Sequence, residues 1–247
     1  MSQSILITGN KGFIASGLEG DGFDIKDGYD IINYKRKKCY DVVIHTAAKI
    51  SVTESMEKPE EYFQTNVIGT LNMLKQHPKA HFIFLSTAGI YGEGTSHTVN
   101  SPINPDSVYA VTKVAGEFLV KTLAHSYCIL RLTNVIGKGE RGEPNVYQVF
   151  EKADVLPIYG DGMQTRDFIH VDKVRKAIME AVDKQGVYNV GSGVSKTILD
   201  VAKEFNKPIK FLPARPGEIR HFGIKTDNWD FSNGDFTINL ENGLCCQ

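Results

Sequence analysis

The chain has 247 residues, of which 41% are hydrophobic, so it can bury the core of one large domain or of one domain with a smaller second region. The 28 basic and 29 acidic residues nearly cancel, which argues against a nucleic-acid partner or a membrane-surface role. No apolar run is long enough to cross a bilayer, no signal peptide is recognised, and the four cysteines lack metal-ligand spacing. We therefore expect a cytoplasmic protein that holds no metal.

The first predicted element is a buried parallel strand at residues 4–8, which form a short, β-branched, apolar run. The segment Gly9-Asn-Lys-Gly12-Phe-Ile-Ala15 follows directly and predicts a dinucleotide-binding loop. Gly9 allows a tight turn, Gly12 lets the backbone approach a pyrophosphate, and Ala15 is small enough for close helix packing. We expect a helix to begin here and to offer its free N–H groups to the phosphates. For this segment alone, an ordinary strand-to-helix turn is the alternative.

The stretch that follows the glycine loop is short for a doubly wound fold. Only about 25 residues separate the loop from the next strong strand, whereas one βαβ unit usually takes roughly 30 or more. We predict a first helix of barely two turns that ends by Glu19, an abbreviated strand at residues 23–27, and a third short strand at residues 30–31.

This short stretch contains the carboxylates that could bind the ribose of an adenosine. Asp27 is the preferred residue for hydrogen bonding the ribose 2′-hydroxyl, which would favour NAD over NADP. Asp24 and a plain turn aspartate are the alternatives. The basic run at residues 35–38 is either a solvated segment or a contact for a ribose phosphate, and NADP stays an alternative cofactor.

Strands and helices alternate through the first two thirds of the chain. Further strands are predicted at residues 40–46, 82–86 and 127–132, and helices at about residues 60–76 and 107–125. This alternation predicts an α/β fold with a doubly wound, Rossmann-type parallel sheet over residues 1–134. We expect residues 135–247 to form a small α/β substrate-binding region, with helices at about 171–183 and 195–206, some segments of which return to the sheet.

Tyr109 and Lys113 lie four residues apart on the second predicted helix, so they share a face and are separated by about 6 Å along the axis. A fixed positive charge beside a phenol favours the phenolate form, which a proton-abstracting tyrosine requires. The pair alone is weak, because surface helices produce this spacing by chance. In combination with the glycine loop and Thr87, in that order along the chain, it predicts a dinucleotide-dependent enzyme.

Several ordered motifs make the chain resemble the extended short-chain dehydrogenases, specifically the NAD-dependent nucleotide-sugar epimerase/dehydratase group. The likeness covers nearly the whole length. The motifs are Thr8-Gly9-Asn-Lys-Gly12-Phe-Ile, His45-Thr-Ala-Ala48, Asn66-Val-Ile-Gly-Thr-Leu71, Ser86-Thr-Ala-Gly-Ile-Tyr-Gly92, Tyr109-x-x-x-Lys113 with Glu117, Arg131-Leu-Thr-Asn134, the segment from Gly160 to Val171, and Tyr188-Asn-Val-Gly191.

The resemblance implies roles for individual residues. Tyr109 would be the acid/base, Lys113 its partner and a ligand of the nicotinamide ribose, and Thr87 a hydrogen-bonding partner of the reacting sugar oxygen. The implied cofactor-binding residues are Gly9, Lys11, Gly12, Phe13, Ile14, Asp27, Ala47, Ala48, Asn66, Tyr109 and Lys113. For Asn66, a bond to backbone alone is the alternative.

The resemblance also implies a nucleotide-sugar substrate. Asn134, Arg166 and Arg215 look like ligands of its diphosphate, because guanidinium groups suit two adjacent phosphates. A homodimer is implied as well, in which the helices at about 60–76 and 107–125 pack into a four-helix bundle. Burial of the second helix against its own sheet is the alternative reason for its apolar faces.

The residues after Thr87 favour one reaction within the family. Sugar 4,6-dehydratases of this family carry an Asp-Glu pair there, whereas this chain has Ala88 and Gly89, which cannot transfer protons. The resemblance therefore implies 4-epimerisation of a UDP- or dTDP-sugar through a transient keto sugar. An NADPH-dependent 4-keto-sugar reductase or epimerase-reductase is the alternative, and a non-catalytic nucleotide-binding protein is a further one.

Overall fold

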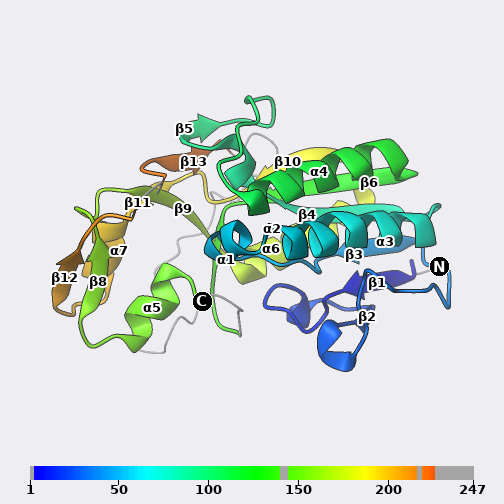
Figure 1. Cartoon of the computed structure of the whole chain (residues 1–247), viewed down its shortest axis with the longest axis horizontal. Coiled ribbons are helices and arrows are strands. Elements are labelled where there is room, and N and C mark those ends of the chain that lie inside the picture. Colours follow the sequence, from blue (N-terminus) through cyan, green and yellow to red (C-terminus); the bar gives the residue numbers. More distant parts are fainter. Residues whose placement is uncertain (1–2, 140–143, 216–218, 226–247) are drawn as a thin grey trace.

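The computed structural model describes residues 3–139, 144–215 and 219–225, so Cys245 and Cys246 lie outside the described residues. Its centre is a six-stranded sheet in which all neighbouring strands are parallel (Figure 1). In spatial order the strands are β10 (Gly186–Val190), β6 (Ser126–Leu132), β4 (His81–Thr87), β3 (Val42–His45), β1 (Ile5–Thr8) and β2 (Asp21–Phe23). The predicted Rossmann-type parallel sheet is confirmed.

Helices cover both faces of this sheet because its strands are apolar on both sides. On β4, Phe82 and Phe84 pack against one set of helices, while Ile83 and Leu85 belong to the core on the opposite face. The first set comprises α1 (Val52–Glu57), α2 (Pro59–Phe63), α3 (Thr70–Gln76) and α4 (Val108–Leu123) (Figure 1). The opposite core is closed by α6 (Val171–Glu180), which continues into η5 (Ala181–Asp183).

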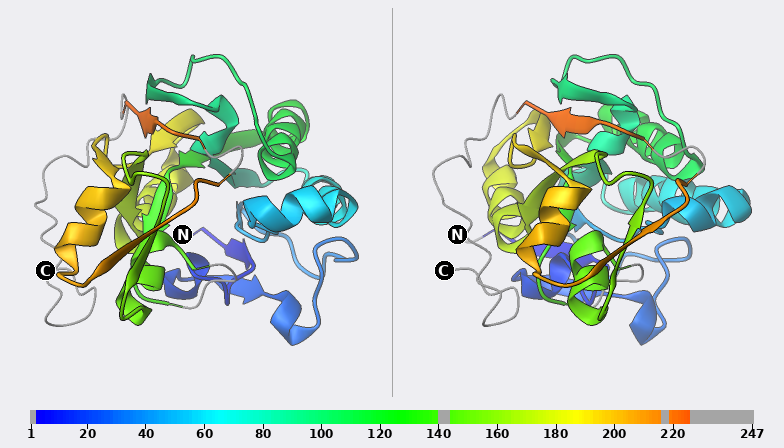
Figure 2. Two further views of the ribbon diagram at one scale, coloured as in Figure 1. Left: turned by 60° about the vertical axis from the view of Figure 1, so that its left-hand side comes forward. Right: turned by 90° about the vertical axis from the view of Figure 1, so that its left-hand side faces the viewer.

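A smaller region begins where β6 ends and gathers at one end of the molecule (Figure 2). Its elements are β7 (Asn134–Ile136), α5 (Val146–Lys152), β8 (Leu156–Tyr159), β9 (Thr165–His170), β11 (Ser195–Thr197), α7 (Ile198–Glu204) and β12 (Ile209–Leu212). A further parallel pair joins β5 (Gly94–His97) to β13 (Phe222–Ile224). Between these segments, α6 and β10 return to the main sheet, so the chain crosses between the two regions more than once.

The predicted helices are present with altered details. The helix expected at residues 60–76 is formed by α2, a π-helical segment η3 (Gln64–Gly69) and α3. The helix expected at 107–125 is α4, and that at 171–183 is α6 with η5. The segment expected as a helix from 195 begins with the strand β11 and becomes helical only at Ile198, where α7 starts.

The short stretch after the glycine loop differs from the prediction. The expected two-turn first helix is wrong, because only a three-residue 3₁₀ turn, η1 (Ala15–Gly17), forms there. The second strand, β2, ends at Phe23, and residues 25–27, predicted as its end, form the 3₁₀ turn η2 (Ile25–Asp27). The third strand expected at residues 30–31 is absent, since residues 31–33 form a turn. The stretch is too short for a helix, two strands and their connections, so β2 is an edge of the sheet.

Side-chain contacts replace the missing strand. The Asn72 amide on α3 donates to the carbonyl oxygens of Ile31 (2.8 Å) and Tyr34 (2.9 Å), and this holds the turn in place. The Tyr34 ring stacks on Phe23 of β2, with ring centroids 4.5 Å apart.

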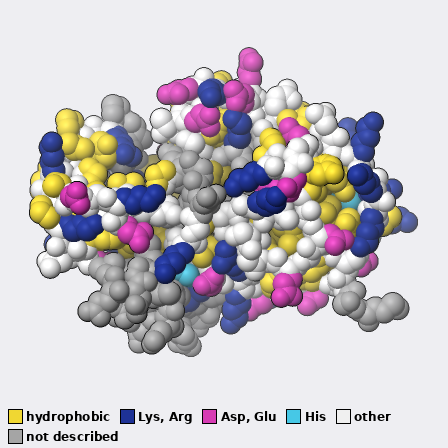
Figure 3. All heavy atoms as spheres, turned by 90° about the horizontal axis from the view of Figure 1, so that it is seen from below, with side chains coloured by type: hydrophobic (Ala, Val, Ile, Leu, Met, Phe, Trp, Pro, Cys, Tyr) yellow, Lys and Arg dark blue, Asp and Glu magenta, His cyan; other side chains and the backbone are white. Residues whose placement is uncertain are grey.

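On the face seen from below, basic and acidic side chains lie interspersed with apolar ones (Figure 3).

Replacing Asn72 by alanine removes both hydrogen bonds to the turn. We expect the free energy of unfolding to fall by about 1–2 kcal/mol, because two carbonyl groups lose their donor. Urea denaturation followed by circular dichroism measures this change. The matched control is Asn33→Ala, an exposed residue of the same turn, for which we expect a change below about 0.5 kcal/mol. Equal effects in the two variants would show that the Asn72 amide does not hold the turn.

Candidate active site

Tyr109 and Lys113 lie in the first two turns of α4. Ser107 caps this helix by accepting a hydrogen bond from the Ala110 amide (3.3 Å). Tyr109 is half-buried, whereas Lys113 is only 5% exposed. The Lys113 ammonium lies 6.0 Å from the centroid of the Tyr109 ring, so the structure brings this predicted pair together.

A backbone carbonyl fixes the position of the Lys113 charge. Lys113 Nζ donates to the Leu85 carbonyl oxygen (2.9 Å), which lies two residues before Thr87 on β4. Burial lowers the pKa of Lys113 to about 8, and the nearby charge of Glu117 opposes this shift. The ammonium is thus held between α4 and the carboxyl end of β4.

Thr87 is the last residue of β4 and is half-buried. Its Oγ1 accepts a hydrogen bond from the Gly89 amide (3.1 Å) and caps the turn η4 (Ala88–Tyr91). Because the hydroxyl oxygen is used as an acceptor here, its hydrogen is available to donate to another group.

Ser55 is a contributor that the sequence analysis missed. This residue of α1 is fully buried, and its hydroxyl accepts a hydrogen bond from the Tyr109 amide (3.1 Å) while donating to the Val52 carbonyl oxygen (2.6 Å). It therefore sets where the first turn of α4 lies. The contact spans 54 residues, and no residue near Ser55 in the sequence indicates it.

A buried charged network holds the rest of α4 against the sheet. The Glu117 carboxylate accepts two hydrogen bonds from the Arg131 guanidinium on β6, at 2.9 and 2.7 Å, and a third from Ser86 Oγ at 2.7 Å. Arg131 also donates to Tyr91 Oη (2.7 Å), which in turn donates to Asn189 on β10 (2.7 Å). The network joins α4 to three neighbouring strands of the sheet.

The glycine loop packs closely on the segment that follows β3. Gly9 has a φ of +68°, and a Cβ atom there would lie 2.9 Å from the Ala47 Cα atom. The Gly9 amide donates to the Phe23 carbonyl oxygen (2.8 Å), and the Gly12 amide donates to that of Gly9 (2.9 Å). Only glycine fits at position 9, as the predicted tight turn requires.

Asn66 contacts the backbone directly after Ala48, in the segment that follows β3. Asn66, in the π-helical segment η3, is buried and exchanges two hydrogen bonds of 2.9 Å with the backbone of Lys49, directly after Ala48. It also donates to Thr112 Oγ1 of α4 (3.0 Å). Asn66 thus ties the segment after β3 to the helix that carries Tyr109.

His45 is a second buried tether that the sequence analysis missed. Its ring nitrogens contact Thr8 Oγ1 (2.9 Å) and Thr70 Oγ1 (3.0 Å) and so connect β1 to α3. Burial and the charge of Lys113 lower the pKa of His45 to about 3, so the ring is neutral at physiological pH.

Both candidate ribose carboxylates contact the glycine loop. Asp24 directly follows β2, is 7% exposed, and accepts hydrogen bonds from the amides of Lys11 (3.1 Å) and Lys26 (2.9 Å). Asp27 lies in η2 and forms an ion pair with the Lys11 side chain. A ribose-binding carboxylate is expected at the end of the second strand. Asp24 lies at this place, whereas Asp27 lies three residues further on.

The predicted substrate ligands all lie in the smaller region. Asn134 on β7 donates to the carbonyl oxygen of Asp167 (3.1 Å), and Arg166 on β9 donates to that of Thr165 (2.8 Å). The exposed Arg215 guanidinium lies over the Tyr159 ring, 3.8 Å from its centroid.

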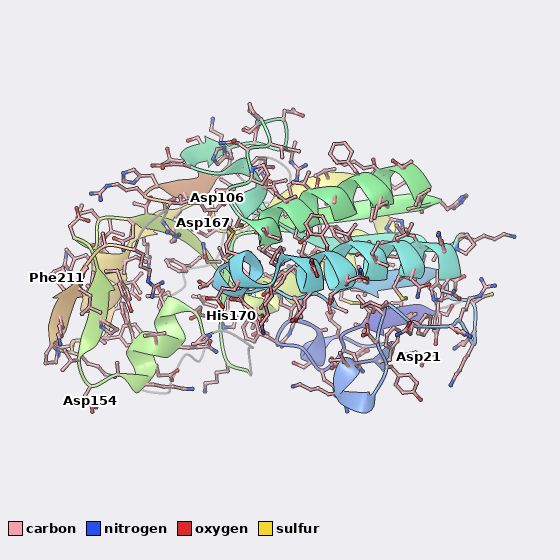
Figure 4. The ribbon with its side chains drawn as sticks, in the orientation of Figure 1. Asp21, Asp106, Asp154, Asp167, His170 and Phe211 are labelled. Carbon is pink, nitrogen blue, oxygen red and sulfur yellow. The ribbon has the colours of Figure 1, made fainter. Side chains whose placement is uncertain are left out.

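Asp167 fixes the connection between β9 and the segment after β10 (Figure 4). Its carboxylate is fully buried and accepts hydrogen bonds from the amides of Ser192 (2.8 Å) and Gly193 (2.9 Å). Burial raises the pKa of this carboxyl, and these hydrogen bonds oppose the shift. Asp167 orients the strand on which Arg166 lies.

The residues around the glycine loop fit a dinucleotide. The two glycines keep the loop compact, as a diphosphate-binding turn requires, since a Cβ atom at Gly9 would meet Ala47 and one at Gly12 would lie 3.0 Å from the Gly9 carbonyl oxygen. Among the described residues, Asn10 Oδ1 is buried with no hydrogen-bond partner, and the Asn10 side chain packs against Gly22 of β2. One expected feature is missing: no regular helix follows the loop to present its N-terminus to the phosphates.

The described part of the chain, residues 3–139, 144–215 and 219–225, shows neither a metal-binding cluster nor a membrane-spanning helix. No cluster of three or more His, Cys, Asp or Glu side chains there could hold a metal ion. None of its helices combines the length and the apolar character needed to cross a membrane.

Replacing Lys113 by methionine tests whether the ammonium is desolvated. The folded-state pKa of about 8 lies below the ordinary value of 10.5, so between these values the unfolded chain holds a proton that the folded chain has released. The cost of burying Lys113 therefore falls as the pH rises. We expect the unfolding free energy of Lys113→Met, relative to the wild type, to drop by about 2 kcal/mol from pH 8 to pH 10. Urea titrations at each pH measure this difference, and a constant difference would contradict the burial of the charge.

Comparison with known proteins identifies the family. Residues 17–191 match the NAD dependent epimerase/dehydratase family. A putative UDP-glucose 4-epimerase of Methanocaldococcus jannaschii is 37% identical, over 97% of this chain and 86% of the relative. A dTDP-glucose 4,6-dehydratase of Xanthomonas campestris is 31% identical, over 90% of this chain and 76% of the relative. The structure of a UDP-N-acetylglucosamine 4-epimerase from Methanobrevibacter ruminantium superposes with a TM-score of 0.80 at 27% identity, over 92% of this chain and 90% of that one. The chain belongs to the NAD-dependent epimerase/dehydratase family, whose members act on nucleotide sugars.

Proposed function

We propose that this protein is an NAD-dependent nucleotide-sugar 4-epimerase that acts on a UDP- or dTDP-sugar, with Tyr109 as its acid/base. The observation that carries this proposal is the position of Lys113, whose ammonium lies 6.0 Å from the Tyr109 ring centroid and is fixed to the Leu85 carbonyl. A charge held in this way favours the phenolate form of Tyr109.

Each residue then has a defined task. The Tyr109 phenolate takes the proton of the sugar 4-hydroxyl, and it returns a proton to the same oxygen when the carbonyl carbon is reduced from its opposite face. The Thr87 hydroxyl, with its oxygen already engaged by the Gly89 amide, donates its hydrogen to the same sugar oxygen. NAD, when bound, supplies the reversible hydride acceptor for the carbon atom. Substrate and cofactor both end in their starting oxidation states, because the transient keto sugar rotates in the site and is then reduced again.

The end of β4 supports epimerisation over dehydration. Elimination of water requires further acid/base groups beside the sugar, and the two residues after Thr87 are Ala88, which is fully buried, and Gly89. Neither can transfer a proton. The relatives include epimerases and dehydratases alike, so this part of the proposal rests on the two residues after Thr87.

NAD is the proposed cofactor in preference to NADP. Of the basic run at residues 35–38, Lys38 is engaged in an ion pair with Asp21 of β2 (2.9 Å), which leaves less positive charge for a 2′-phosphate. Asp24 or Asp27 would accept a hydrogen bond from the adenosine ribose. An NADPH-dependent 4-keto-sugar reductase is the alternative function, and it would consume reduced cofactor in the assay below.

Asn134, Arg166 and Arg215 are the proposed ligands of the substrate diphosphate. Arg166 and Arg215 bring positive charge to the smaller region, which begins at the carboxyl end of β6, the strand next to β4. A guanidinium stacked on an aromatic ring, as Arg215 is on Tyr159, can still donate its N–H groups to two phosphate oxygens.

We also propose that the reaction takes place in the cytoplasm, which imaging of a tagged chain would test.

Tyr109→Phe tests the proposed function directly. We expect turnover to fall by about 10²–10⁴-fold, because the variant lacks the proton acceptor. Chromatography of UDP-glucose incubated with NAD and protein measures the formation of its 4-epimer, and calorimetric titration with NAD should give an unchanged Kd. Tyr127→Phe, at the far end of β6, serves as the control and should retain full activity. A fully active Tyr109→Phe variant, or a wild type that dehydrates the sugar, would contradict the proposal.

We further propose a homodimer that forms through the exposed side of α2, η3 and α4, which lie side by side on one face of the sheet (Figure 1). Phe63, Ile68 and Phe118 are exposed there, and Phe118 has 59% of its surface accessible. Apolar side chains gathered on such a face are typical of protein interfaces.

Light scattering of the wild type should give twice the 27.4 kDa chain mass. Phe118→Glu should shift the protein to the monomer, because burying a carboxylate in an apolar contact is costly. Phe211→Glu, an equally exposed residue on β12, should leave the mass unchanged. A wild type that is monomeric at micromolar concentration would refute the dimer.

A further inference from the structure

Arg175 reaches from α6 to the backbone of the glycine loop. Its Nε donates to the Ile14 carbonyl oxygen (2.9 Å), and one of its terminal nitrogens donates to that of Phe13 (3.0 Å). The other terminal nitrogen is paired with the Asp172 carboxylate (2.8 Å). The contact with Ile14 joins residues 161 positions apart in the sequence.

These two carbonyls would be occupied differently in a regular helix. There, the amides of residues 17 and 18 would bond to the carbonyls of Phe13 and Ile14. In this chain the Ser16 amide does reach the Gly12 carbonyl (2.9 Å), but the Leu18 amide bonds to Ala15 instead (2.9 Å), and the helix ends after one turn. The Arg175 guanidinium supplies the donors that the missing helical turn would have supplied.

Gly17 provides the space for the arginine. A Cβ atom at this position would lie 2.6 Å from Arg175 Nε and 2.7 Å from Cζ. Any side chain on residue 17 would therefore displace the guanidinium from the loop. The Arg175 side chain is 22% exposed, so its charge is only partly screened by solvent.

We propose that Arg175 is a positioning residue for the dinucleotide, which takes the place of the absent first helix behind the glycine loop. It does so mainly by holding the carbonyls of Phe13 and Ile14, and so the backbone that follows Gly12; its guanidinium also lies behind the loop, with Asp172 as its counter-ion. A full helix would contribute roughly half a positive charge at its N-terminus. This inference rests on the proposed function in one respect, namely that the glycine loop binds the diphosphate of NAD.

The test compares ligand binding by three variants of the full chain. Arg175→Met removes the charge and the donors, Arg175→Lys keeps the charge but not the paired donors, and Gly17→Ala leaves the arginine present but displaced. Lys176→Met, on the same helix and 71% exposed, is the control. Calorimetry gives the Kd for NAD, ADP and adenosine, and hydrogen exchange of the ligand-free proteins reports the protection of the amides of Ser16 and Leu18.

We expect Arg175→Met and Gly17→Ala to weaken NAD and ADP by about tenfold or more. Adenosine, which lacks phosphate, should change by less than about threefold, and Arg175→Lys should fall between the wild type and Arg175→Met. Exchange at Ser16 and Leu18 should be faster in Arg175→Met and unchanged in Lys176→Met. If Arg175→Met does not fold, Gly17→Ala and Arg175→Lys decide by the same criteria.

The possible failures can be told apart. A wild type that binds neither NAD nor ADP would overturn the proposed function and, with it, this inference. A wild type that binds NAD while all three variants match it would overturn only the role of Arg175. An equal loss of affinity for adenosine and ADP would also overturn it, since a general disturbance of the fold would then account for the effect.

Discussion

The site depends on the buried ion pair between Glu117 and Arg131, because this pair sets the position of α4 on the sheet. Two charges without solvent are costly unless their hydrogen bonds are complete. Here the carboxylate receives both guanidinium bonds and the Ser86 hydroxyl, while Arg131 extends the network to Tyr91 and, through it, to β10. The side chains that α4 presents one and two turns earlier, Lys113 and Tyr109, are placed by the same contact. The buried hydrogen-bond network around Glu117 and Arg131 therefore also positions the two proposed catalytic side chains.

The second constraint is the shortness of the chain between β1 and β3. A complete doubly wound sheet uses this stretch for a helix and two further strands, and here it provides one short strand and two 3₁₀ turns. The missing hydrogen bonds are supplied by side chains from distant elements. Asn72 on α3 holds the turn beyond β2, and Arg175 on α6 holds the backbone after the glycine loop. The loss of regular structure is compensated on both faces of the sheet, each time by a side chain with several donors.

The sequence predicted the parallel sheet well, because its strands are apolar runs whose identity does not depend on distant partners. It also predicted that Tyr109 and Lys113 would meet, since helical spacing alone places them together. The short stretch after Gly12 was predicted less well. Its apolar and acidic residues allow a helix or a strand locally, and the outcome depends on Arg175 and Asn72, which are far away in the sequence. Ser55 was missed for the same reason: nothing near it in the chain indicates a bond to the Tyr109 amide.

The early end of the sheet at β2 has a consequence for solubility. An edge strand exposes unpaired backbone groups that can template intermolecular β-pairing, and long, flat, apolar edges are the most hazardous. Here the edge is only three residues long, and its first residue, Asp21, is bound by Lys38 and by the Tyr40 hydroxyl (3.0 Å). Charged groups and brevity thus discourage a second chain from extending the sheet. The edge strand β2, beyond which no further strand is added, is thereby protected against intermolecular pairing and aggregation.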